Sequence, residues 1–87
     1  MTLKILSAGG DEVAGDMRQA IEELLPGAQV QVNPQGAGHF VVRVVSEAFE
    51  GKGPVQRQQL VYGAIARFMS GDTAPVHAID RMETQTP

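Results

Sequence analysis

Apolar positions in the first third of the chain follow a helical period. They recur at intervals of four, four and three residues, which places one face of a helix toward a core: Val13, Met17, Ile21 and Leu24. Asp11 or Asp16 is expected to cap the start of this helix. Pro26-Gly27 is expected to end it, because neither residue extends a helix well.

The pattern then changes to alternation. Val30 and Val32 fall on one side of residues 28–33 and polar residues on the other, which predicts a half-buried strand. Pro34 to Gly38 has the composition of a loop, and residues 39–45 are β-branched and apolar enough to form the most buried strand. The two strands are expected to form an antiparallel hairpin.

A second helix is expected from Pro54, because proline suits the first turn and glycines precede it. Its apolar stripe runs toward Gly71-Asp72, and Gly63 is expected to mark a bend into a third helix. The residues expected in or beside the core along this stretch are Leu60, Val61, Tyr62, Ala64, Ile65, Phe68 and Met69.

A last extended segment, from Val76 to about Met82, mixes apolar and charged residues as an edge strand does. The order α-β-β-α-α-β predicts an α+β fold, a two-layer domain in which helices cover one face of a three-stranded mixed sheet. The chain of 87 residues is long enough for one core only. We expect a single domain over 11–87, preceded by an N-terminal arm of uncertain structure over 1–10.

The composition of the chain excludes several classes of function. The chain is 43% hydrophobic and 20% charged, with a net charge of -3, so a surface that is basic throughout and made for nucleic acid is excluded. The start of the chain is too weakly apolar for a signal peptide and no run is long enough for a membrane span, so we expect a cytoplasmic protein. The chain has no cysteine, so any thiolate ligand must come from a partner.

One stretch is distinctive at the level of motif. Residues 45–52 read V-S-E-A-F-E-G-K, followed by Arg57 and by L-V-Y at 60–62. Together with His39-Phe40 and V-H-A at 76–78, this pattern resembles the BolA family over residues 13–87. The R-Q-Q-L-V-Y form and the lack of cysteine are closest to the acid-stress branch, and the resemblance implies a fold like the class II KH domain.

The chain departs from the family pattern at both ends. Residues 1–10 have no obvious counterpart, and the chain stops at Thr86-Pro87, where many members continue into a tail. The segment from His77 to Pro87 is one residue longer than usual. The last strand can accommodate this extra residue by a bulge, or by a slip that changes which side chains face the sheet.

The resemblance to the BolA family implies a role for each of the two histidines. It implies that His77, at the start of the last strand, and His39, at the end of the hairpin loop, are metal ligands. It also implies that the partner is a monothiol glutaredoxin with glutathione, sharing a bridged [2Fe-2S] cluster in iron–sulfur trafficking or an iron and acid-stress response. Mixed histidine and thiolate ligation is chemically sound. The structural alternative for each histidine is a partly buried side chain at a strand end that is hydrogen-bonded to the backbone.

A second candidate site is a nucleic-acid-binding turn made by Gly51, Lys52, Gly53 and Arg57, with Arg43 and Arg67 as extensions. Backbone N–H groups and cations hold phosphates, and KH domains use a related turn, which would suit a transcription regulator that binds DNA. The G-x-G spacing is a weak match to G-x-x-G, so a turn that starts a helix is the favoured interpretation.

No catalytic constellation is expected. Ser46 and Ser70 lack a base and an orienting acid, and Glu47 and Glu50 are better explained by solubility and helix-start charge. We therefore expect a non-enzymatic adaptor that is a monomer when alone, with a metal-free interaction module as the third hypothesis.

Overall fold

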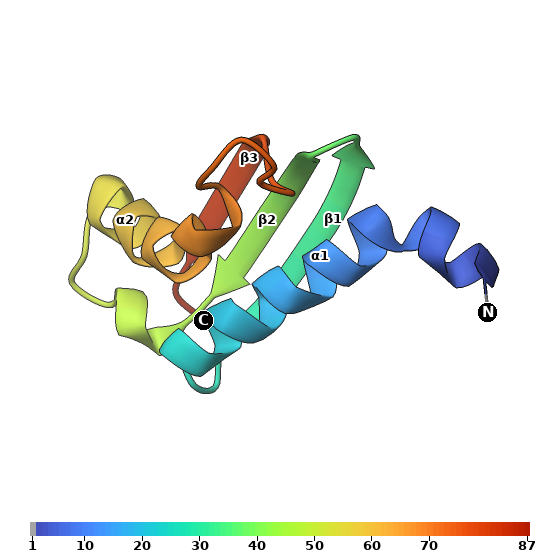
Figure 1. The fold of residues 1–87 in the computed structure, drawn as a ribbon. Coiled ribbons are helices and arrows are strands. Elements are labelled where there is room, and N and C mark those ends of the chain that lie inside the picture. Colours follow the sequence, from blue (N-terminus) through green and yellow to red (C-terminus); the bar gives the residue numbers. More distant parts are fainter. Residues whose placement is uncertain (1) are drawn as a thin grey trace.

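The computed structural model describes residues 2–87, and side chains from residue 10 onward. The elements are α1 (Thr2–Leu24), β1 (Gln29–Gly36), β2 (His39–Val45), α2 (Pro54–Ile65) and β3 (Ala78–Gln85), with 3-10 turns η1 (Glu47–Phe49) and η2 (Ala66–Phe68). The expected two-layer α+β fold with a mixed sheet is confirmed (Figure 1). Within this described part of the chain, none of the helices has the length and apolar character that spanning a membrane requires.

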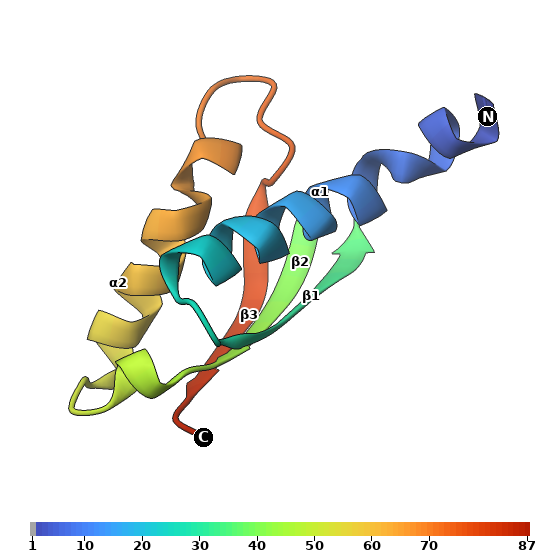
Figure 2. The ribbon, with the colours of Figure 1, turned by 90° about the horizontal axis from the view of Figure 1, so that it is seen from below.

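Helix α1 begins earlier than the sequence predicts. It starts at Thr2 rather than after a cap at Asp11 or Asp16, because no proline interrupts the preceding segment. The segment expected to be an arm is thus helical from Thr2, and Met1 lies outside the described residues. Figure 2 shows α1 beside α2, with its N-terminal part projecting past the end of β1.

The inward stripe of α1 also differs at one position. Leu25, rather than Leu24, completes the stripe after Met17 and Ile21: Leu25 is 5% exposed, whereas Leu24 is 47% exposed. A residue three or four places after Ile21 can share its face. The N–H of Leu25 still donates to the carbonyl of Ile21 (2.9 Å), so helical geometry continues to Leu25 and places it one turn after Ile21 on the same face.

The sheet has the order β1-β2-β3, with β1 antiparallel and β3 parallel to the central strand β2. Alternate residues of β2, namely Phe40, Val42 and Val44, are buried in one core cluster with residues of α1 and α2. Both helices therefore cover the same face of the sheet. The other face carries His39, Arg43 and their neighbours on β1 and β3.

Helix α2 begins at Pro54, as predicted. Its stripe packs inward through Val61 and Ile65, but Tyr62 is 38% exposed and is not a core residue. The third helix expected after Gly63 is instead the single turn η2, because α2 continues through Gly63 and tightens only after Ile65.

Strand β3 contains the bulge that its extra residue raised as a possibility. Phe40 pairs with Ile79, but the next residue of β2, Val41, pairs with Arg81, so Asp80 is unpaired. The strand begins at Ala78 and extends to Gln85, two residues later at its start and three later at its end than the sequence predicts.

Candidate ligand site at one end of the sheet

The two histidines lie at the same end of the sheet. Gly36 of β1 pairs with His39 of β2, and His39 pairs with Ala78 of β3, directly after His77. We call this the His39 end of the sheet. The carbonyl of Gly38 joins the two strands there, because it accepts hydrogen bonds from the N–H groups of His77 (2.8 Å) and Ala78 (3.1 Å).

The His77 ring lies against the backbone of Gly38. A Cβ atom at Gly38 would approach the ring to 2.6 Å from Nδ1 and 2.7 Å from Cγ, so only glycine leaves room for the imidazole. Gly38 also has φ +74°, a conformation that glycine adopts at little cost. His77 is exposed, so its ring is open to a partner molecule.

The His39 ring lies on the helix-free face of the sheet, with its side chain 48% exposed. Its Nδ1 is 2.9 Å from Oδ1 of Asp80, the bulged residue of β3. This contact joins residues 41 positions apart in the sequence. The ring is thus held on one side and accessible on the other.

The donor set fits a shared metal centre rather than a closed one. Among the described residues, no group of three or more histidine, cysteine, aspartate or glutamate side chains is arranged to hold a metal ion. Two exposed imidazoles at one sheet end are suitable ligands for iron or zinc, but a tetrahedral site needs further ligands from outside. His39 and His77 could therefore contribute at most two ligands to a metal centre, and the remaining ligands would have to come from another molecule.

The residues of the candidate nucleic-acid-binding turn make contacts with other residues of the chain. Arg57 donates from Nε to the carbonyl of Lys52 (2.7 Å), and its guanidinium lies 5.8 Å from the ring centre of Phe49. The N–H of Gly53 donates to Oε1 of Gln56 at 3.4 Å. Gly51 has φ +75°, as a tight turn requires. These contacts favour the interpretation of Gly51 to Arg57 as the start of α2.

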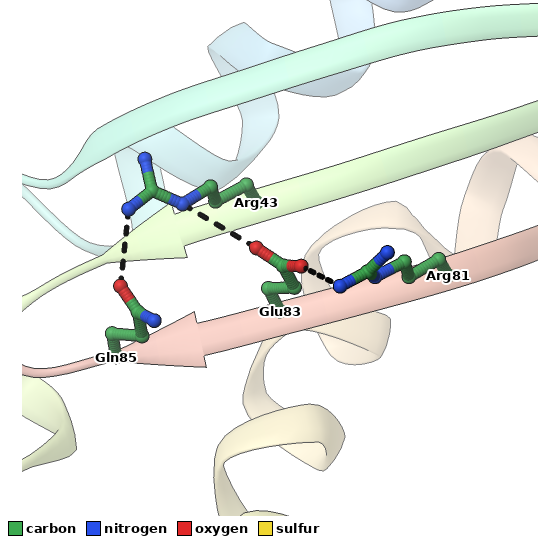
Figure 3. Close-up of polar contacts among 4 residues, drawn as sticks. All are labelled: Arg43, Arg81, Glu83 and Gln85. Atoms are coloured by element: carbon green, nitrogen blue, oxygen red, sulfur yellow. Dashed lines mark hydrogen bonds and ion pairs between the residues drawn. The ribbon is translucent and has the colours of Figure 1, made fainter.

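The arginines named as extensions of that candidate have other partners. Arg43 contacts Glu83 (Nε to Oε1, 3.4 Å) and donates from Nη2 to Oε1 of Gln85 (3.1 Å), and Arg81 contacts Glu83 from the other side (Figure 3). Arg67 lies over the ring of Phe68 at 4.9 Å. The charge of Arg43 is thus balanced on the outer face of the sheet, which weakens a phosphate-binding role.

The two serines are engaged in local backbone contacts. Ser46 is 4% exposed, and its hydroxyl accepts a hydrogen bond from the N–H of Ala48 (3.0 Å), which caps η1. Ser70 donates to the carbonyl of Ala66 at 3.1 Å. Capping and turn contacts of this kind explain both residues without a chemical role.

Two residues at the His39 end of the sheet had no role in the sequence analysis: Gly38 and Asp80. Gly38 belongs to a glycine-rich loop whose composition signals only a turn. The extra length of the last segment signalled a bulge, but no sequence feature indicated that its unpaired residue would face His39. Both depend on how the starts of β2 and β3 meet.

Comparison with known proteins defines the class. The architecture is shared with solved BolA structures: BolA1 from Arabidopsis thaliana matches with a TM-score of 0.70 and 28% identity, covering 86% of this chain and 92% of that one. A BolA homologue from Coxiella burnetii matches with a TM-score of 0.67 and 33% identity, covering 84% and 88%. The fold is therefore that of a BolA-type α+β domain.

The family model described as BolA-like protein matches residues 23–87. Human BolA-like protein 1 is 45% identical over 56 residues, which are 64% of this chain and 38% of that relative's length. The chain belongs to the BolA-like family. The resemblance on which the sequence analysis relied is thus confirmed, while the ligand assignments remain predictions.

Proposed function

We propose that this protein is a BolA-like adaptor that binds a monothiol glutaredoxin carrying glutathione and shares a [2Fe-2S] cluster with it. The observation that supports this most directly is the pair of exposed imidazoles at one end of the sheet, in a domain without cysteine. The role in the cell is iron–sulfur trafficking or an iron and acid-stress response in the cytoplasm. In this proposal the protein acts as an adaptor and not as an enzyme.

Each histidine has a distinct part in the proposal. His77 is the principal ligand, because Gly38 leaves space for its ring at the open start of β3. His39 is the second ligand, from the first residue of β2. The cluster would supply redox-active iron, and His77 and His39 would supply imidazole nitrogens to it at an accessible surface.

The arrangement of the backbone supports ligands at this position. The N–H groups of His77 and Ala78 both donate to the Gly38 carbonyl, so the backbone at His77 is held relative to that at His39. A ligand pair on fixed strand ends loses little conformational freedom when a partner binds. The partner's thiolates complete the coordination sphere.

The test is reconstitution with a partner. The protein is mixed with a glutathione-loaded monothiol glutaredoxin, ferrous iron and sulfide under anaerobic conditions, and visible absorption and circular dichroism are recorded. We expect a spectrum distinct from that of the glutaredoxin alone. His77→Ala is expected to abolish the difference, and His39→Ala to reduce it.

Gln29→Ala is the matched control. Gln29 is exposed and pairs with Val45, at the opposite end of the sheet from His39, so its loss is expected to leave the spectrum unchanged. A wild-type mixture that shows only the glutaredoxin spectrum would contradict the proposed function. A mixed spectrum that survives His77→Ala would contradict the ligand assignment.

A further inference from the structure

The bulge in β3 preserves the core rather than disturbing it. Ile79 pairs with Phe40 and Met82 pairs with Val42, and all four lie on the helix-covered face although Ile79 and Met82 are three residues apart. In a regular strand, residues three apart point to opposite faces. The bulge absorbs the extra residue, Asp80, so both β3 side chains reach the core.

The residue that the bulge leaves unpaired is Asp80, and it lies on the same face as His39. Its side chain is 43% exposed, and its Oδ1 is 2.9 Å from Nδ1 of the His39 ring. Arg81, the next residue, contacts Glu83 instead. The bulge thus places one carboxylate specifically beside one imidazole.

This contact determines which ring nitrogen carries the proton. An ionised carboxylate only accepts hydrogen bonds, so the group facing Oδ1 of Asp80 must be an Nδ1–H donor. In a neutral ring the other nitrogen, Nε2, then keeps its lone pair. A carboxylate that fixes the tautomer and direction of a histidine in this way is a common companion of metal-binding imidazoles.

We propose that Asp80 is a positioning residue that holds His39 in the Nδ1–H tautomer and leaves Nε2 directed outward as the ligating atom. The inference rests on the proposed function for its purpose, but the tautomer itself is a property of the isolated chain. The competing explanation is a surface ion pair with no consequence for the ring. Exposed ion pairs contribute little to stability, so a stability measurement would not separate the two explanations. They differ in the tautomer of the His39 ring.

The first measurement reads the tautomer directly, without partner or metal. Ring 15N chemical shifts of the histidines are recorded in alkaline buffer, because only a neutral imidazole has two tautomers. We expect wild-type His39 to be protonated at Nδ1. Asp80→Ala is expected to shift the His39 population toward Nε2–H, and Asp80→Glu to retain Nδ1–H in larger part, because it keeps an acceptor-only group.

Two internal controls accompany this measurement. The His77 ring signals are expected to stay unchanged in Asp80→Ala, and Arg81→Ala is expected to leave His39 unchanged, because Arg81 contacts Glu83. Wild-type His39 protonated at Nε2, or a His39 ring that is the same with and without Asp80, would overturn the inference whether or not a cluster forms.

The second measurement connects the tautomer to ligation. In the glutaredoxin mixture, Asp80→Ala is expected to change the visible circular dichroism in the direction of His39→Ala, and Asp80→Glu to restore part of the wild-type signal. If the wild-type mixture shows no shared-cluster spectrum, the proposed function fails while the tautomer result stands. If the spectrum forms and Asp80→Ala leaves it unchanged, the positioning role is overturned.

Discussion

Gly38 serves two purposes at once. Its φ of +74° belongs to the left-handed region, and its missing side chain leaves the space that the His77 ring occupies. Its carbonyl meanwhile holds the start of β3 through two hydrogen bonds. A single residue therefore sets both the backbone at the His39 end of the sheet and the position of the principal candidate ligand.

Gly38→Ala is expected to lower the free energy of unfolding by about 1–3 kcal/mol, because alanine is strained in this conformation. The new methyl group also displaces the His77 ring, which would be 2.6 Å away at its nearest atom. Urea denaturation measures the first effect, and the ring signals of His77 in NMR spectra measure the second.

Gly63→Ala is the control for that substitution. Gly63 lies inside α2, and apart from the neighbouring residues and backbone of its own helix, a Cβ atom there would meet nothing within 4 Å. Alanine is therefore expected to raise the free energy of unfolding by roughly 0.5–1 kcal/mol. Equal effects at the two glycines would show that the conformation and crowding at Gly38 are of no consequence.

At the scale of elements, the bulge in β3 reconciles a three-residue spacing of apolar side chains with a two-residue strand period. Removing Asp80 would leave Ile79 and Met82 two residues apart and so suited to the same face of a regular strand. The bulge is thus needed only because Asp80 is present, and a chain without Asp80 could bury both residues in a regular strand.

Deletion of Asp80 is expected to leave the protein folded, with a free energy of unfolding within about 1 kcal/mol of wild type, because the core pairs are retained. His39 would nevertheless lose its carboxylate partner. Circular dichroism and urea denaturation measure the stability, and the His39 ring signals report the local change.

Deletion of Met82 is the comparison. It shortens β3 by the same amount, but Arg81 or Glu83 must then take the inward position opposite Val42. Burying an unpaired charge there is expected to destabilise the domain severely. Equal tolerance of the two deletions would contradict the register described above.

At the scale of the whole molecule, the short turn η1 links the sheet to α2. Phe49, at the end of this turn, is fully buried and belongs to the same core cluster as residues of α1, β2 and α2. The guanidinium of Arg57 lies over its ring. One aromatic side chain thus supports packing between both layers.

Phe49→Ala is expected to cost about 3–5 kcal/mol, as large aromatic truncations in cores do. Because small domains have a total stability of only about 5–15 kcal/mol, the variant is expected to be partly unfolded on moderate warming. Val55→Ala, at a position 65% exposed, is expected to stay within about 0.5 kcal/mol of wild type. Thermal and urea denaturation of the pair provide the measurement, and similar losses would contradict the core described here.

The sequence by itself determined the features that depend on local backbone rules and on motif. It predicted the bounds of β2, the start of α2 at Pro54, the two-layer architecture and membership in the BolA-like family. Hydrophobic periodicity, the geometry of proline and a long segment that matches the family can all be read from residues close together in the sequence.

The tertiary structure decided what depends on register between distant segments. It selected Leu25 over Leu24, replaced a third helix by η2 and paired Arg43 with Glu83. It also brought Asp80 to His39 across 41 positions of sequence. Such contacts follow from how two strands align, and a shift of one residue exchanges the faces of every side chain beyond it.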